Sequence, residues 1–306
     1  MAPRLIINAD DFGLTPGVNR AIAELHQAKA LTSATLMATG AAFDDAAAIA
    51  HANPTLGVGC HIVLTDGVPV LPPERIPTLI GPDRKTFRPS LIDFVQALLL
   101  GNILEVDIAR EAAAQIQKLQ IAGIAITHLD THKHTHLFPA VLRPLLGIAE
   151  RMSIHAIRQP FEQPWSLALG HGNRIRRLEV KLLSPLKTRF EQQPQIRNRQ
   201  VLSTDGTIGI SATGNLYRET LHQILHAMPP DGTFELVCHP GYNDSDLDRI
   251  PTRLRTHRDI ERNALLAEIP AIALHPNALH LINYGNLGAH VAPLDAMPDT
   301  RRERVL

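Results

Sequence analysis

Apolar runs and helix-like segments alternate along most of the chain. The stretches "RLIINAD" (4–10) and "TFELVCHP" (233–240) are apolar at successive positions rather than at every second one. Strands buried on both faces have this pattern, whereas strands with one solvated face alternate apolar and polar residues. Further strand candidates are "SATLMAT" (33–39), "LGVGCHIVL" (56–64), "AITHLDTH" (125–132), "AIRQP" (156–160), "IPAIAL" (269–274) and "LHLINY" (279–284).

Helical periods lie between these runs. Residues 15–30 predict a helix with Thr15 at the N-cap and Pro16 in the first turn, and residues 43–52 and 139–152 predict two more. Buried strands separated by helices imply a parallel sheet with right-handed crossovers. The pattern therefore predicts an α/β fold, either a barrel or an open doubly wound sheet.

Two segments interrupt this rhythm. Residues 66–90 are rich in proline and turn residues and predict a long ordered loop, whereas residues 161–215 have no clear strand partner. We expect one domain over 1–306 with elaborated loops at about 66–90 and 161–215.

Composition narrows the functional classes. Lys plus Arg and Asp plus Glu both number 30 and aromatic residues make up 4%, so we expect no nucleic-acid partner. Two cysteines, Cys60 and Cys238, favour a reducing compartment over a disulfide framework. No signal peptide and no apolar run long enough to span a membrane is evident. We expect a cytoplasmic protein.

Acidic residues and histidines follow several predicted strands. Asp10 and Asp11 follow "LIIN", His61 follows "LGVGC", a histidine cluster follows "AITHL", and His239 follows "FELVC". The carboxyl ends of parallel strands meet at one edge, where sites form in such folds. One carboxylate and two imidazoles hold a divalent ion with open positions, and a second carboxylate can act as general base. The edge therefore predicts metal-assisted hydrolysis.

Neighbouring carboxylates diverge on an extended strand, so Asp10 and Asp11 share one site only if the chain bends near Gly13. Capping of the next helix is the alternative role for either aspartate. His61 or His239, taken alone, would more often be a hydrogen-bonded core histidine than a metal ligand.

The stretch "HLDTHKHTH" (128–136) spaces four histidines and an aspartate at alternate positions. In a strand they would share one face, which favours a metal site over a solvated histidine patch. The run is too long for all of its members to bind one ion, so the others would support the ligands or contact substrate.

Five blocks of the sequence resemble the YdjC-like carbohydrate deacetylase family, which includes the chito-oligosaccharide deacetylases. These blocks are "NADDFGLTPGVNRAI", "GVGCHIVLT", "THLDTHKHTHLFP", "IRQP" and "CHPGY". The resemblance implies a distorted TIM-like barrel and metal-dependent removal of the N-acetyl group from an N-acetylglucosamine-type sugar. It is weaker over 66–120 and 161–230.

The resemblance also implies roles for individual residues. The metal ligands would be Asp11, His61 and His132, with Mg or Zn as the divalent ion. The remaining implied roles are Asp10 as general base, His239 as acid or oxyanion stabiliser, and Arg158, His134 and His136 as substrate contacts, with His136 also an alternative ligand. Lys133 stands where relatives often carry another histidine.

The overall texture is closest to the subgroup associated with hopanoid biosynthesis, which implies a glycolipid substrate. Residues 174–189 contain six basic residues and one acidic residue among Leu, Ile and Val. This segment could contact the inner membrane face peripherally, although most amphipathic helices instead pack on their own domain.

Two rival functions remain at this stage. A metal-dependent phosphoesterase would need a second ion held by further carboxylates, and few strand-end acids are available. A sugar- or metal-binding protein without turnover would need no base beside a ligand. The sequence does not indicate the oligomeric state.

Overall fold

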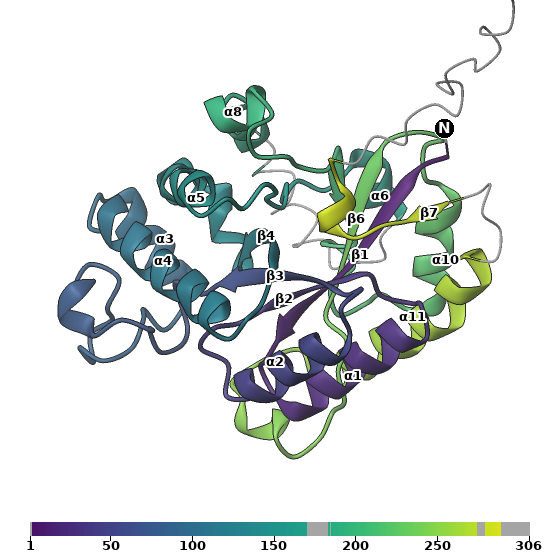
Figure 1. Cartoon of the computed structure of the whole chain (residues 1–306), viewed down its shortest axis with the longest axis horizontal. Helices are drawn as coiled ribbons and strands as arrows, with labels where there is room; N and C mark the ends of the chain where they lie inside the picture. Colours follow the sequence, from purple (N-terminus) through teal and green to yellow (C-terminus); the bar gives the residue numbers. More distant parts are fainter. Residues whose placement is uncertain (1, 170–182, 184, 274–278, 289–306) are drawn as a thin grey trace, which may run out of the picture.

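The computed structural model describes residues 2–169, 183, 185–273 and 279–288 (Figure 1). Its strands are β1 (Arg4–Phe12), β2 (Ser33–Leu36), β3 (Gly57–Ile62), β4 (Ile126–Thr131), β5 (Gly206–Ile208), β6 (Thr233–Cys238) and β7 (His280–Leu281). Its α-helices are α1 (Pro16–Gln27), α2 (Phe43–Ala52), α3 (Leu91–Leu99), α4 (Glu105–Ile121), α5 (Pro139–Arg151), α6 (Pro164–Leu169), α8 (Leu186–Glu191), α9 (Pro194–Arg197), α10 (Arg218–His226) and α11 (Thr256–Ala273). Short 3-10 turns are η1 (Pro73–Arg75), η2 (His132–Leu137), η3 (Leu247–Arg249) and η4 (Tyr284–Asn286).

The strands form one parallel sheet in the order β4-β3-β2-β1-β6-β5, and β7 pairs with the first residues of β1. The extended segment 156–162 connects the two edges of this sheet. Ile157 forms a parallel bridge with Leu129 of β4, and Glu162 forms one with Thr207 of β5. The sheet therefore curls into a distorted barrel, which confirms the predicted TIM-like α/β fold.

Helices cover the outside of the curled sheet. α1, α2 and α11 lie together beside β1, and α4 packs on α5 beside β3 (Figure 1). α1 begins as predicted, because Thr15 accepts a hydrogen bond from the Val18 amide at 3.2 Å and Pro16 occupies the first turn. The helix predicted over 43–52 has the same bounds in the structure.

One predicted strand is wrong. Residues 269–273 of "IPAIAL" are the last turns of α11, where Ile269 packs into the core. A short apolar run fits a buried strand and a buried helix equally well, and Pro270 lies inside α11 without ending it.

The two long segments differ in character. Within 66–90, Ile80 and Phe87 form an antiparallel bridge, and Glu111 of α4 accepts hydrogen bonds from the Val70 and Leu71 amides. Segment 161–215 contains β5, which pairs with β6, so the expectation of no strand partner there is wrong. β5 has only three residues, which is too short to leave a sequence pattern.

The basic stretch 174–189 falls largely on residues outside those that the structure describes; its final residues lie in α8. Among the described residues, no helix combines the length and the apolar character needed to cross a membrane.

Candidate metal centre

β1 kinks where its two aspartates occur. Asp11 has a left-handed backbone with φ of 65°, and the pairing with β2 shifts register between Ala9 and Phe12. Aspartate adopts this conformation more readily than most residues because its short polar side chain compensates locally. The bend therefore lies at Asp11 itself, ahead of Gly13, and it allows Asp10 and Asp11 to approach the same histidine, His61.

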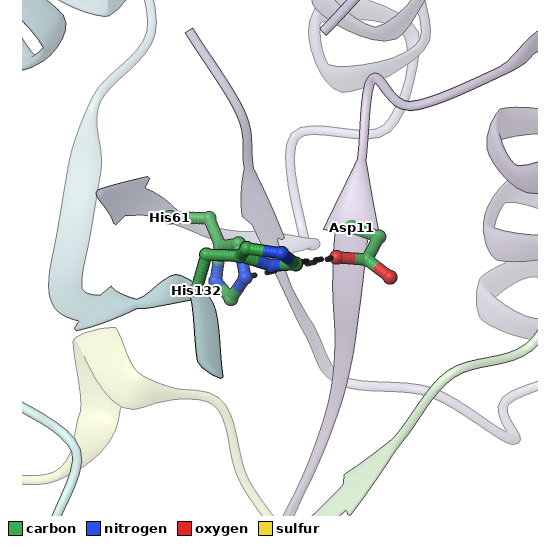
Figure 2. Close-up of side chains that lie close together, drawn as sticks. All are labelled: Asp11, His61 and His132. Atoms are coloured by element: carbon green, nitrogen blue, oxygen red, sulfur yellow. Dashed lines mark ion pairs between the residues drawn. The ribbon is translucent and has the colours of Figure 1, made fainter. Parts of the chain in front are cut away.

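Asp11, His61 and His132 bring three ligand atoms together (Figure 2). Asp11 Oδ1 lies 3.7 Å from His61 Nε2 and 3.5 Å from His132 Nδ1, separations too long for good hydrogen bonds. Two ligand atoms about 2.1 Å from one ion, with an angle of about 110° between the bonds, would be about 3.4 Å apart. The three residues therefore fit a shared divalent ion.

A second carboxylate orients His61. Asp130 Oδ1 lies 2.8 Å from His61 Nδ1, so this nitrogen carries a proton and Nε2 is the nitrogen that faces Asp11. Burial alone would lower the pKa of His61, but Asp130 and the other nearby carboxylates raise it to about 9. An environment that favours a proton on this ring also favours a bound cation.

Arg158 lies beneath the centre and has no exposed surface. Its guanidinium donates to both oxygens of Asp10, at 2.9 and 2.6 Å, and pairs with Asp130 at 2.5 Å and Glu235 at 2.7 Å. Burial opposes ionisation of Asp10, but Arg158 outweighs it and holds the pKa of this carboxyl well below its usual range. The fully buried guanidinium is committed to carboxylates, which favours a supporting role for Arg158 over the predicted substrate contact.

Asp11 has its own cationic partner. Arg258 of α11 donates from Nη2 to Asp11 Oδ2 at 2.6 Å, which leaves Oδ1 facing the two histidines. Burial would raise the pKa of Asp11, but Arg258 and His132 hold it well below its ordinary value. Asp11 is therefore ionised, as a metal ligand must be.

His239 follows β6 at the rim of the centre. Its Nε2 lies 3.8 Å from Asp10 Oδ2, and its amide donates to Glu261 of α11 at 2.5 Å. The side chain is 13% exposed, more than either carboxylate of the pair Asp10 and Asp11. The ring can therefore meet a molecule that enters from solvent.

The histidine run is not one strand. β4 ends at Thr131, and the chain turns through η2, in which Lys133 and His134 have left-handed backbones. The predicted alternation therefore fails after Asp130, and only His132 of the four histidines reaches the ligand group in the part of the chain that the structure describes. Lys133 pairs with Asp66 at 2.7 Å, away from the three ligands.

The other histidines of the run differ in exposure. His136 is fully buried, with Nδ1 2.6 Å from Thr131 Oγ1 and Nε2 3.2 Å from the Arg158 carbonyl. Both ring nitrogens are therefore occupied inside the fold, which favours a structural role for His136 over the predicted roles as substrate contact and alternative ligand. His128 is also buried and stacks on Tyr284, with ring centroids 3.8 Å apart. His134 is partly exposed, with its ring 6.5 Å from that of His136.

Sequence reasoning missed the residues that surround the ligands. Glu235 is a lone acid inside the apolar run "TFELVC", which could have marked it as paired. Arg258 and Glu261 carry no such signal, because charged residues are ordinary on a helix that has a solvent face. Tyr284 comes from the last described segment, far from any motif.

The chain is similar to known proteins over most of its length. The sequence model of the YdjC-like protein family matches residues 4–271. A carbohydrate deacetylase of Brevibacillus brevis is 30% identical over 285 residues, covering 93% of this chain and 100% of that protein. A carbohydrate deacetylase of Thermoanaerobacter pseudethanolicus is 28% identical over 287 residues, covering 92% and 98%.

A crystal structure of a protein from Enterococcus faecalis V583, described as a candidate cellobiose-phosphate cleavage protein, also has this fold. The two structures superpose with a TM-score of 0.68 and 25% identity, over 94% of this chain and 99% of the other. The chain belongs to the YdjC-like protein family.

Proposed function

We propose that this protein is a metal-dependent hydrolase that removes the N-acetyl group from an N-acetylglucosamine-type sugar. The observation that carries the proposal is the convergence of Asp11, His61 and His132 beside an ionised Asp10. The full-length similarity to carbohydrate deacetylases supports the same reaction class.

Asp11, His61 and His132 would hold the divalent ion. Their donor set, one carboxylate oxygen and two imidazole nitrogens, suits Zn²⁺ and tolerates Mg²⁺. When bound, the ion supplies Lewis acidity that polarises the acetyl carbonyl and acidifies water. Asp130 and Arg258 fix the orientation of two of these ligands.

Asp10 is the proposed general base. Arg158 holds both of its oxygens, so the carboxylate is fixed and ionised before the reaction and would become protonated when it takes a proton from the attacking water. The new C–O bond forms on the acetyl carbon as the C–N bond breaks. Because Arg158 keeps Asp10 a weak base, Asp10 would accept the proton as the water oxygen bonds to the acetyl carbon and its proton becomes acidic.

His239 is the proposed acid or oxyanion stabiliser. Its ring stands at the rim, 3.8 Å from Asp10, where it can donate a proton to the departing amine nitrogen. The products are acetate and the free amino sugar. His134 remains a proposed substrate contact because it is the partly exposed member of the run beyond His132.

The second acidic group of the site argues against the phosphoesterase. Asp10, His61 and Asp130 also lie within 4.8 Å of one another, as a second ion would require. Arg158 pairs with both carboxylates of this group, and its fixed positive charge takes the place of that ion. The arrangement therefore favours one ion and amide hydrolysis.

The finer proposal is that the sugar is carried by a hopanoid lipid. Its support is the basic, apolar sequence of residues 174–189, which would suit a peripheral membrane contact on the cytoplasmic side. A soluble chito-oligosaccharide is the alternative substrate.

Acetate release tests both the proposed deacetylation and the proposed lipid-linked substrate. N-acetylglucosamine-terminated substrates, one soluble and one lipid-linked, are incubated with the metal-loaded enzyme, the metal-stripped enzyme and His132→Ala. We expect acetate only from the loaded wild-type enzyme, and the faster substrate identifies the carrier. Metal bound at the centre without acetate from either substrate would refute the deacetylase.

A further inference from the structure

Helix α3 has apolar residues at exposed positions, where a surface helix normally has polar ones. Residues 91–100 read "LIDFVQALLL", in which Asp93 is the only charged residue and Gln96 the only other polar one. One side of α3 enters the core through Phe94 and Leu98. A helix that is apolar on nearly all faces is normally buried on all of them. The sequence of α3 is therefore that of a helix with a further partner.

The exposed apolar side chains gather at the turn between α3 and α4, on the outside of the curled sheet (Figure 1). Leu99 and Leu100 lie at the end of α3, and Leu104 and Val106 lie at the start of α4. Ile92 is seven residues before Leu99, so both lie on one face of α3. These five side chains, which we call the α3 patch, are between 48% and 75% exposed.

The size of the α3 patch fits the apolar part of a dimer interface. At about 120–150 Å² for a fully exposed aliphatic side chain, the five residues present on the order of 400 Å² of apolar surface. A standard interface buries about 800 Å² per partner, of which about two thirds is apolar in homodimers. The patch therefore supplies most of the apolar area that each copy in a stable dimer needs.

The charges around the patch favour a protein partner over a membrane. Residues 91–109 contain three acidic residues and no lysine or arginine, so an anionic lipid surface would not attract this region. Glu105, between Leu104 and Val106, pairs with Arg143, which gives the patch a polar border of the kind that protein interfaces have. The formal net charge of the chain is zero, so two copies do not repel each other.

The rest of the described surface indicates a symmetric contact. A contact between unlike surfaces of two copies would need a second apolar patch, whereas a two-fold contact uses the same patch twice. In the described part of the chain, the other large apolar side chains that are exposed are Val68, Ile121 and Tyr217, which are far apart in the sequence. We infer that the α3 patch binds the α3 patch of a second copy of this chain, which forms a two-fold symmetric homodimer.

Sedimentation velocity of the full-length protein tests the inference. We expect the wild type to sediment with twice the mass of one chain at micromolar concentration. Leu100→Glu should raise the dissociation constant of the dimer by at least about 30-fold, because each copy would bury a carboxylate in an apolar contact. Ile121→Glu is the matched control, since it changes an exposed apolar residue of α4 outside the patch. It should remain dimeric.

Leu104→Glu is a second variant of the patch and should also dissociate the dimer. Both leucines are exposed, so native circular dichroism is expected in both variants. A monomeric wild type, or a dimer that persists in folded Leu100→Glu and Leu104→Glu, would overturn the inference. Monomers that co-sediment with phosphatidylglycerol vesicles through the patch would also overturn it, by making the patch a membrane contact. The α3 patch includes no residue of the metal centre, so the result is independent of the deacetylase.

Discussion

At the scale of single residues, Asp130 determines how His61 presents its nitrogens. Its carboxylate touches no proposed reactant, yet one oxygen accepts from His61 Nδ1 and the other pairs with Arg158. The same side chain therefore links the proposed ligands to the proposed base. The strand pattern placed Asp130 beside the histidines, but only the fold showed that it supports a ligand.

We expect Asp130→Asn to weaken metal binding at the centre by about 10–100-fold, because the neutral amide leaves His61 less basic and less firmly oriented. Competition dialysis against a chelator of known affinity measures the change. Asp66→Asn is the matched control, since Asp66 pairs with the neighbouring Lys133 and contacts none of the ligands. Unchanged affinity in a folded Asp130→Asn protein would contradict the orienting role.

At the scale of elements, the sequence predicted which site residues follow the strands. It did not predict which residues orient them. Asp10, His61 and His239 each follow an apolar run, and parallel strands bring such ends to one edge. The turn after β4 was not predictable, because two non-glycine residues adopt left-handed backbones there. The sequence therefore indicated the site but gave the wrong geometry for its histidine run.

The segment that contains β7 and η4 is an element without any sequence motif, and it lies beyond the residues that the family model matches. It pairs with β1 and places Tyr284 against the buried charges. Tyr284 donates to Glu235 Oε2 at 2.5 Å, while the other oxygen of Glu235 accepts from Arg158. The end of the described chain therefore supports the cation that holds Asp10.

We expect Tyr284→Phe to lower the free energy of unfolding by about 1–3 kcal/mol, because a buried carboxylate loses a donor. Urea denaturation measures this change. We also expect a lower kcat with little change in KM, since Asp10 would be held less firmly. Tyr217→Phe, at a residue that is 44% exposed, should change neither quantity. A Tyr284→Phe protein of wild-type stability would show that Glu235 does not need this bond.

At the scale of the whole molecule, the curled sheet surrounds a buried network of charges. The alternation of strands and helices predicted either a barrel or an open sheet. Segment 156–162 forms bridges with β4 and with β5, so the sheet is a barrel. The sequence predicted a strand at 156–160 within this segment, but it did not predict β5, because a strand of three residues leaves no periodic signal. Histidines buried inside the barrel make the free energy of unfolding depend on pH in acid.

His128 and His136 lie within this enclosure and stay neutral. Burial, opposed only in part by Asp130, lowers the pKa of His128 to about 3 and that of His136 to about 4. In the unfolded chain both rings take up protons below their ordinary pKa of about 6.5. The unfolded state therefore binds more protons between about pH 6.5 and 4, and stability falls as the pH falls through this window.

We expect His128→Phe to make this dependence shallower, because the variant keeps a ring against Tyr284 but has no proton to bind. The slope of the unfolding free energy against pH should decrease by up to about 1.4 kcal/mol per pH unit, the value for one proton. Urea titrations of the metal-stripped protein across the window measure it, since proton release from bound metal is then absent. His155→Phe, at an exposed histidine, should leave the slope unchanged. Equal slopes in His128→Phe and the wild type would mean that His128 takes up its proton in the folded protein, and that its burial does not contribute to acid sensitivity.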